Sequence, residues 1–324
     1  MKRVGNLYEQ ICSIENLRIA DQKARKGKTG DYGVRMHDRN SESNLLLLHE
    51  ALINKTYRTS EYTTFIVHEP KEREVYRLPY YPDRIVHHAI MNVLEPIFVA
   101  SFTADTYSCI KGKGIHACSN GIKKALKDVQ GTTYCLKIDI KKFYPNVDHD
   151  VLKGLLRRKF KDADLLWLLD EIIDSAAGLP IGNYLSQYLA NFILSGFDHW
   201  VKEELRMPYY FRYSDDMAFP FRCKKRLHGV LHLVRMYLKE LKLEIKDNYQ
   251  IFRISDRGLN MVGYVHFHFV TFLRKSIKVR FAKMLSKCHS LSSIWGYFGW
   301  AKHCNSRHLI KKLLWNKQSL VSLT

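Results

Sequence analysis

Residues 209–221 read YYFRYSDDMAFPF, the most informative segment of the chain. Two apolar runs rich in aromatic residues flank a short polar centre, a pattern typical of a strand, a tight turn and a second strand. The turn would present two adjacent carboxylates, Asp215 and Asp216. Like charges at such close range raise each other's pKa, and divalent cations relieve that cost. Taken alone, the pair is a weak sign of a metal site, since an exposed turn accounts for most Asp-Asp pairs.

A third carboxylate, Asp139, stands 76 positions upstream of Asp215. It follows residues 134–138, an apolar run that predicts a strand. If this strand neighbours the turn, three carboxylates converge and complete a two-metal site for phosphoryl transfer. Hard oxygen ligands favour two Mg²⁺ ions, with Mn²⁺ as a substitute. We expect Ile140 to contact the metal ions together with the three aspartates.

The charge balance points to a polyanionic partner. Lysine and arginine number 52 against 32 acidic residues, which gives a formal net charge of +20. Each phosphate that such a surface neutralises releases a condensed counterion, which favours nucleic-acid binding. The basic residues come in short clusters with aromatic residues between them, and aromatic faces can stack on bases. A basic surface that serves only solubility is the alternative.

Composition also limits the class of protein. The 324 residues are 46% apolar, enough for one large domain or two to three small ones. No apolar run approaches the roughly 20 residues that span a bilayer, and the N-terminus lacks the apolar region of a secretion signal. The seven cysteines include no Cys-x-x-Cys pair, which argues for a reducing compartment. We therefore expect a cytoplasmic protein that does not use a membrane.

Helices and strands are expected in mixed order. The apolar periodicity predicts helices over 7–20, 44–53 and 225–241, one after Gly182, one capped by Asp83 and one capped by Asp148. A hairpin is expected over 63–67 and 74–78, and the segment after Gly263 is expected to be helical. Because the order is not strictly alternating, the predicted class is α+β rather than doubly wound α/β.

Several stretches together resemble the ordered motifs of reverse transcriptases. FRYSDD (211–216) resembles their aromatic-x-Asp-Asp box, KIDIKKFY (137–144) their first catalytic motif, and LPIGNYLSQ (179–187) their Gly-x-x-x-Ser motif at a helix start. DRIVHHA (83–89) and YSCIKGKGIH (107–116) are similar to segments of group II intron and related bacterial enzymes. RGLNMVGY (257–264) resembles the hairpin between palm and thumb. The motifs occur in the family's order and cover the chain from about residue 7 to the end.

The resemblance implies a right-hand polymerase with fingers, a palm made of an antiparallel sheet plus helices, and a helical thumb. The expected boundaries are 1–130 for an N-terminal extension and fingers, 131–265 for a palm with inserted fingers elements, and 266–324 for the thumb. The implied activity is that of an RNA-directed DNA polymerase, a nucleotidyltransferase that takes template RNA, a cDNA primer–template and dNTPs. The catalytic residues would be Asp139, Asp215 and Asp216.

The central motif resembles one subfamily in particular. Group II intron and retron enzymes usually carry Gln-Gly and Ser-Pro where this chain has Ile181-Gly182 and Ser186-Gln187, which is similar to the reverse transcriptases of diversity-generating retroelements. KGKGIH (111–116) and LRKS (273–276) also look like that subfamily. Its bacterial or phage-encoded members copy a template-repeat RNA into cDNA, misincorporate opposite adenines, and work with a small basic accessory protein. At Ile181, the loss of an amide would remove a polar check on base geometry.

The family's contacts carry over to the matching positions. The implied nucleotide-binding residues are Lys71, Arg73, Lys111, Lys113, Phe143, Tyr144, Ile181, Gly182 and Gln187. The implied nucleic-acid-binding residues are Tyr213, Ser214, Arg274 and Lys275. Tyr144 falls at the family's steric gate, where a bulky ring would collide with a ribose 2′-hydroxyl and select dNTPs. A core tyrosine that packs beneath the palm is the alternative.

Two positions depart from the family's pattern. Ile110 stands where the family usually has an arginine that grips the triphosphate. A substitute would have to come from Lys71, Arg73, Lys111 or Lys113. Lys246 stands one place early for the lysine that assists pyrophosphate departure, so a role as general acid is left open.

Parts of the sequence are also compatible with other functions. In a polymerase-derived RNA-binding scaffold, three aspartates without metal would only repel RNA phosphates. An RNA-dependent RNA polymerase also uses Asp-Asp turns, and Tyr144 is the feature that discriminates against it. A retron-type or abortive-infection reverse transcriptase is the second candidate. A zinc site is disfavoured because the spacing matches no common finger; it would draw on His266, His268, Cys288, His289, His303, Cys304 and His308.

Overall fold

The computed structural model describes residues 3–68, 72–286 and 291–313. The chain divides into two compact units, each drawn from three stretches of the sequence. Unit 1 comprises Met1–Thr103, Lys141–Asp198 and Tyr237–Glu244. Unit 2 comprises Ala104–Ile140, His199–Met236 and Ile245–Thr324. Helices α10 (Ser195–Glu203) and α11 (Lys224–Glu240) have residues in both units.

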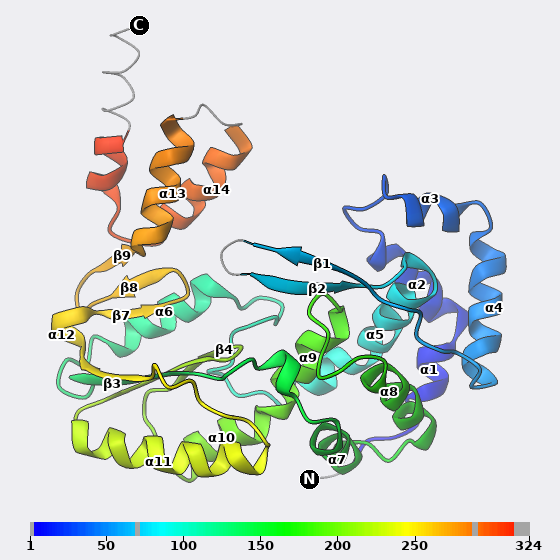
Figure 1. Cartoon of the computed structure of the whole chain (residues 1–324), viewed down its shortest axis with the longest axis horizontal. Coiled ribbons are helices and arrows are strands. Elements are labelled where there is room, and N and C mark those ends of the chain that lie inside the picture. Colours follow the sequence, from blue (N-terminus) through cyan, green and yellow to red (C-terminus); the bar gives the residue numbers. More distant parts are fainter. Residues whose placement is uncertain (1–2, 69–71, 287–290, 314–324) are drawn as a thin grey trace, which may run out of the picture. The chain divides into compact units, whose positions relative to one another are not determined.

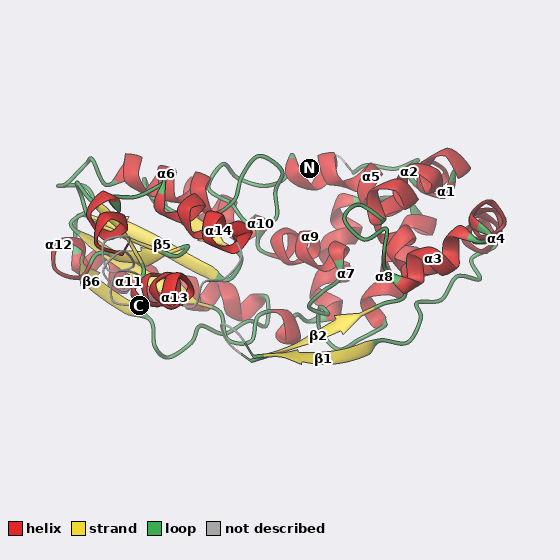
Figure 2. Ribbon diagram, turned by 90° about the horizontal axis from the view of Figure 1, so that it is seen from above, coloured by secondary structure: helices red, strands yellow, loops and turns green. Residues whose placement is uncertain are grey.

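Unit 1 is mostly helical, and its described strands form one hairpin (Figure 2). Its helices are α1 (Tyr8–Cys12), α2 (Ile14–Ala24), α3 (Tyr32–Asp38), α4 (Ser41–Ile53), a π-helical turn (Tyr80–Arg84), α5 (Ile85–Val99), a 3₁₀ turn (Tyr144–Asn146), α7 (His149–Lys159), α8 (Ala163–Asp174) and α9 (Tyr184–Ile193). Helix α5 packs against α1, α2 and α9 and contributes many of the fully buried apolar side chains. The predicted hairpin is confirmed, because β1 (Thr63–Val67) pairs antiparallel with β2 (Arg73–Arg77).

Side-chain hydrogen bonds at the helix ends explain where the helices begin. Asp148 caps α7 as predicted, because its Oδ1 accepts from the backbone N–H of Val151 at 3.0 Å. The single helix expected over 7–20 is wrong. Ser13 adopts an extended ψ of 142° between α1 and α2, and its Oγ accepts from the backbone N–H of Asn16, so it caps a second helix.

The cap expected at Asp83 is also wrong. Its side chain is fully buried, and its Oδ1 accepts from the Tyr57 hydroxyl at 2.8 Å and from the backbone N–H of Ser60 at 3.1 Å. The carboxylate therefore anchors the segment before β1 instead of the start of α5. A buried acid needs such partners, and in this case they come from a distant part of the sequence.

Unit 2 is built on two antiparallel sheets (Figure 1). The four-stranded sheet has the order β4-β5-β3-β6, from β3 (Tyr134–Asp139), β4 (Phe211–Tyr213), β5 (Asp216–Phe221) and β6 (Gln250–Arg253). The three-stranded sheet consists of β7 (Leu259–Met261), β8 (Tyr264–His266) and β9 (Thr271–Leu273). The helices are α6 (Ile115–Ala125), α12 (Ile254–Arg257), α13 (Lys275–Ser286) and α14 (Leu291–Ala301). Helices mixed with antiparallel sheets confirm the α+β class.

The core of unit 2 joins α6 to both sheets. Cys118 and Ile122 of α6 cluster with Phe211 of β4 and with Leu259 and Tyr264 of the smaller sheet. The expectation that the segment after Gly263 is helical is therefore wrong at its start. Two strands come first, because their alternate side chains are buried in this core, and α13 begins only at residue 275.

Gly178 fixes the turn that carries Tyr144. Gly178 has a φ of +63°, and a Cβ at this position would lie 2.5 Å from the carbonyl oxygens of Tyr144 and Pro145. The backbone N–H of Leu179 donates to the Tyr144 carbonyl at 2.8 Å. We call residues 179–182 the LPIG segment. The residue that leads into it therefore touches the backbone of the 3₁₀ turn, a contact that only glycine allows.

We expect Gly178→Ala to lower the free energy of unfolding by about 2–4 kcal/mol, from left-handed strain plus the carbonyl clash. Gly154→Ala is the matched control. Its Cβ would meet no atom within 4 Å inside α7, so it should raise stability by about 0.5–1 kcal/mol. Denaturant unfolding of the three proteins measures both changes. Equal stability of the two variants would contradict the predicted backbone contact.

Candidate active site

The turn between β4 and β5 presents two adjacent aspartates. Tyr213 pairs with Asp216 across the hairpin, so the turn consists of Ser214 and Asp215. Ser214 has a φ of 58°, in the left-handed region that residues other than glycine rarely adopt. Arg212, fully buried, supports the turn by donating from Nη1 to the Ser214 carbonyl at 3.2 Å. The turn is therefore held in a strained conformation by a buried guanidinium.

Strand register brings the third aspartate to this turn. Asp139, the last residue of β3, lies directly opposite Asp216, the first residue of β5. Opposed residues of antiparallel strands have Cα atoms about 4.5–5.5 Å apart. The next residue, Ile140, donates its backbone N–H to the Asp215 carbonyl at 3.3 Å. Three carboxylates therefore gather at one corner of the sheet, which we call the carboxylate corner (Asp139, Asp215 and Asp216).

Burial and mutual repulsion disfavour the charged forms at the carboxylate corner. Burial is the main cause that raises the pKa of Asp215, and the negative charge of Asp139 adds to it. Burial also raises the pKa of Asp216, and although the neighbouring cation Lys137 opposes this rise, the net shift is upward. A site that holds clustered negative charge at this cost favours cations.

Two lysines already supply positive charge there. Lys137 Nζ lies 3.2 Å from Oδ1 and 3.3 Å from Oδ2 of Asp216. Lys246 Nζ binds Asp139 Oδ1, and the Lys246 backbone N–H donates to the Asp139 carbonyl at 2.9 Å. We did not identify Lys137 from the sequence, although its position two residues before Asp139 on a strand places both side chains on one face. Lys246 was considered only as a general acid, and no local pattern predicts its contact with Asp139.

The carboxylate oxygens of the corner are the kind of ligand that a hard divalent cation prefers, although they do not form a complete coordination sphere. Among the residues that the structure describes, no group of three or more His, Cys, Asp or Glu side chains is arranged to hold a metal ion. Asp216 Oδ1 is nevertheless buried without a hydrogen bond, because the nearby Lys137 ammonium does not meet it in bonding geometry. Such an oxygen is suited to a metal ligand. A cation shared by all three aspartates would have to displace Lys246 from Asp139.

The four residues predicted to bind nucleic acid lie on or near this corner of unit 2. Tyr213 and Ser214 belong to the β4–β5 hairpin itself, and burial raises the pKa of the Tyr213 hydroxyl. Arg274 is close enough for its charge to be among those that oppose the burial-driven rise in the pKa of Asp216. Its Nε donates to Asn260 Oδ1 at 2.7 Å, which fixes the guanidinium. Lys275 follows as the first residue of α13, and its side chain is exposed.

Unit 1 holds the predicted residues of the central motif and the steric gate. Phe143 is buried, and the half-exposed ring of Tyr144 packs edge-on against it with centroids 5.6 Å apart. The Ile181 carbonyl accepts from the backbone N–H of Tyr76 in β2 at 2.8 Å. Gly182 has a φ of +119°, and a Cβ there would lie 2.4 Å from the Tyr76 carbonyl oxygen. Strand β2 and the LPIG segment are therefore in backbone contact.

The remaining predicted nucleotide contacts differ in their surroundings. Gln187 is half-buried on α9, and Arg73 is exposed at the start of β2, whereas Lys71 lies outside the described residues. In unit 2, Lys111 is exposed, but the Lys113 ammonium donates to the carbonyls of Ala104 and Thr106, each at 3.0 Å. Lys113 therefore fixes its own loop.

The C-terminal histidines and cysteines make different contacts. His266 is fully buried, and burial lowers its pKa to about 3, while His268 Nε2 lies 3.3 Å from the Thr132 carbonyl. His303 stacks on His116, and Cys304 donates to the Ala301 carbonyl. His308 is exposed, and Cys288 and His289 lie outside the described residues.

Among the helices of the described ranges, none is both long and apolar enough to cross a bilayer.

Several known proteins resemble part of the chain. The family model described as "Reverse transcriptase (RNA-dependent DNA polymerase)" matches residues 69–265. An uncharacterized 91 kDa protein in the cob intron of Schizosaccharomyces pombe is 25% identical over 185 residues, 54% of this chain and 21% of its own length. The group II intron-encoded protein LtrA of Lactococcus lactis is 27% identical over 144 residues, 40% of this chain and 23% of its own length. The matches thus span about a fifth of these relatives.

The fold is also that of solved polymerases. The structure of apo telomerase from Candida tropicalis superposes with a TM-score of 0.50 at 10% identity, covering 68% of this chain and 49% of that one. At this identity the likeness concerns the fold alone, and it confirms the predicted polymerase fold. The family model itself spans strand β2, the LPIG segment and the carboxylate corner. The chain belongs to the reverse transcriptase (RNA-dependent DNA polymerase) family.

Proposed function

We propose that this chain is an RNA-directed DNA polymerase whose catalytic residues are Asp139, Asp215 and Asp216. The observation that carries the proposal is the register of β3 and β5, which sets Asp139 opposite Asp216 at a strained turn inside the family's matched region. In this proposal the fingers and an N-terminal extension occupy residues 1–130, the palm occupies 131–265 and the thumb occupies 266–324. The chain would take template RNA, a primer–template and dNTPs.

The carboxylate corner would hold two Mg²⁺ ions, which when bound activate the primer 3′-hydroxyl and stabilise the leaving pyrophosphate. Asp139 and Asp216 contribute side-chain oxygens from adjacent strands, and Asp215 contributes from the turn. Arg212 and the β3–β5 pairing keep these oxygens in place during the reaction. If metal ions displaced Lys246 from Asp139, its ammonium would remain at the corner, where it could contact the phosphates of a bound nucleotide. That position suits a lysine that neutralises or protonates pyrophosphate.

Nucleotide selection is assigned to unit 1. Buried Phe143 braces the Tyr144 ring, which would exclude a ribose 2′-hydroxyl and so select dNTPs. The backbone contact between Ile181 and Tyr76 fixes the LPIG segment on the fingers hairpin. Gly182, at a position where a Cβ cannot fit, would let the backbone approach the template and the incoming nucleotide. Arg73, Lys111 and Gln187 are the proposed polar contacts, with Lys71 and Lys113 as further cations.

We further propose that the enzyme belongs to a diversity-generating retroelement. Ile181-Gly182 and Ser186-Gln187 support this assignment, because they differ from the Gln-Gly and Ser-Pro usual in group II intron and retron enzymes. The enzyme would then copy a template-repeat RNA into adenine-mutagenised cDNA in a bacterial cytoplasm, together with a small basic accessory protein. Near-identical repeats that differ at adenines, next to the gene, would support this over a retron-type or abortive-infection enzyme.

Replacing Asp215 and Asp216 together with Asn should abolish dNTP incorporation, by at least 1,000-fold, because the metal-binding oxygens are lost. Primer extension on an RNA template measures the loss. RNA affinity should stay within about twofold, because the basic surface is unchanged.

The same double variant should also change the stability of the metal-free protein. The pKa values of Asp215 and Asp216 are higher in the folded state than in the unfolded state, so ionisation of these carboxylates above pH about 4 favours unfolding. In EDTA at pH 7 the variant should therefore be at least as stable as wild type.

The matched control is Asp256→Asn, which removes an exposed carboxylate on α12 and should extend primers like wild type. Undiminished synthesis by the double variant would contradict the proposed mechanism. Wild-type extension with rNTPs as readily as with dNTPs would contradict the gate assigned to Tyr144 and would favour an RNA polymerase.

Replacing Ile181 with Gln should lower the error rate opposite template adenines by about tenfold, because an amide restores a hydrogen-bonding check on the new base pair. Sequencing of cDNA made on an adenine-rich RNA measures this rate, and errors opposite the other three bases serve as the internal reference. Ile181→Leu, which adds no polar group, is the control. An unchanged adenine error rate in Ile181→Gln would show that this position does not govern fidelity.

A further inference from the structure

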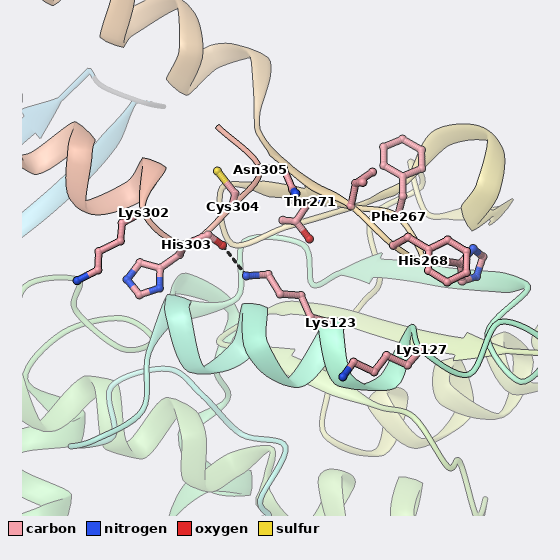
Figure 3. Close-up of a pocket in the computed structure, with 11 residues that line it drawn as sticks. Lys123, Lys127, Phe267, His268, Thr271, Lys302, His303, Cys304 and Asn305 are labelled. Carbon is pink, nitrogen blue, oxygen red and sulfur yellow. Dashed lines mark hydrogen bonds between the residues drawn. The ribbon is translucent and has the colours of Figure 1, made fainter. Parts of the chain in front are cut away.

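Unit 2 contains a cavity of about 520 Å³ (Figure 3). Three segments line it: the end of α6 with the residues just after it, the turn between β8 and β9 with the first residue of β9, and the segment that follows α14. The residues that define it chemically are Lys123, Lys127, His268, Phe269, Lys302 and His303. No Asp or Glu is among its lining residues. We call this cavity the basic pocket.

Hydrogen bonds and ring stacking brace the basic pocket. Lys123 Nζ donates to the His303 carbonyl, the contact marked by the dashed line in Figure 3. The His303 ring stacks on His116 with centroids 3.8 Å apart and planes 22° from parallel. Asn305 exchanges two hydrogen bonds with the Thr271 backbone: its Oδ1 accepts at 2.9 Å and its N–H donates at 2.8 Å. The walls are therefore held in place before a ligand binds.

Other groups of the basic pocket are free to bind a ligand. The side chains of Lys127 and Lys302 are exposed, and neither makes an ion pair with a residue in the described ranges. The Phe269 side chain is 83% exposed, which is unusual for a large aromatic ring. Its centroid lies 6.4 Å from that of His268. Unpaired cations thus border exposed ring faces.

The basic pocket lies at the opposite end of β3 from the carboxylate corner. His268 Nε2 lies 3.3 Å from the carbonyl of Thr132, just before β3, whereas Asp139 is the last residue of that strand. A strand rises about 3.3 Å per residue, so the two sites are about 20 Å apart along one strand. A single nucleotide bound in the basic pocket is too short to reach the carboxylate corner.

We propose that the basic pocket is an exosite that binds single-stranded nucleic acid. Phosphates would lie against Lys127 and Lys302, with Lys123 behind them, and a base would stack on Phe269 or His268. This combination of a cationic groove and exposed rings is what sequence-independent single-strand binding requires. A docked protein would need a broader apolar patch than the tip of this turn offers. The inference adds to the proposed function, because the exosite would hold a distant part of the nucleic acid during synthesis.

The test compares Lys127→Ala/Lys302→Ala with Lys224→Ala/Lys225→Ala, which removes two exposed lysines from the start of α11. Affinity for unstructured 30-nucleotide RNA and DNA is measured by fluorescence anisotropy across a salt series, on the full chain. The Lys127/Lys302 variant should bind about tenfold more weakly, and its salt slope should fall by about 1.4, or 0.7 for each lost phosphate contact.

The aromatic ring is tested separately. Phe269→Ala should weaken binding about tenfold without changing the salt slope, and Phe269→Trp should restore affinity, because stacking does not depend on charge. A compact hairpin primer–template has no long single strand. Phe269→Ala and Phe269→Trp should therefore extend it as well as wild type does. Equal losses with RNA and DNA would indicate recognition of the shared phosphates and base faces, and a loss with one alone would identify the strand that the exosite holds.

Binding by the Lys127/Lys302 variant as tight as that of the α11 control would overturn the proposal. So would full affinity in Phe269→Ala. The readout is independent of catalysis, so it separates the two proposals. If wild type failed to extend any primer, the proposed function would fall, while the anisotropy data would still decide whether the exosite exists.

Discussion

Electrostatic repulsion among Asp139, Asp215 and Asp216 is the constraint on which the site depends. The β3–β5 register and a two-residue turn force the three carboxylates to one corner, and burial there raises the pKa of Asp215 and Asp216. A fold that only needed stability would not gather these charges. Positive charge must therefore be supplied at the corner in every state of the protein.

Without metal, that charge comes from Lys137 and Lys246. Each lysine binds one carboxylate, and Lys246 also ties its backbone to Asp139. Divalent ions held by the three aspartates would displace the ammonium of Lys246 from Asp139, and this ammonium would then be available to phosphate oxygens. Lys246 would thus pair with Asp139 in the absence of metal ions and with phosphate in their presence. Buried Arg212 keeps the turn in place throughout.

Sequence patterns predicted the elements whose causes are local. The strand–turn–strand pattern in residues 209–221, the strand at 134–138 and the Asp148 cap are all confirmed. Features with distant partners were missed or misassigned. Asp83 looked like a helix cap, but its partner Tyr57 comes from another segment. Strands β8 and β9 are three residues each, too short for a period-two signal. The approach of Lys246 to Asp139 depends on a register that no local pattern predicts. The convergence of Asp139 with the Asp215–Asp216 turn was predicted from the sequence, but the exact pairing of Asp139 with Asp216 was not.

The central claim is that three carboxylates form one cation site. Binding of Mn²⁺ to the chain with primer–template and dNTP, followed by electron paramagnetic resonance, tests it most directly. Wild type should bind two ions per chain, and Asp139→Asn should lose at least one of them or weaken binding about 100-fold, because Asp139 faces Asp216 across the sheet. If Asp139→Asn bound two ions as tightly as wild type, the carboxylate corner would not be the metal site.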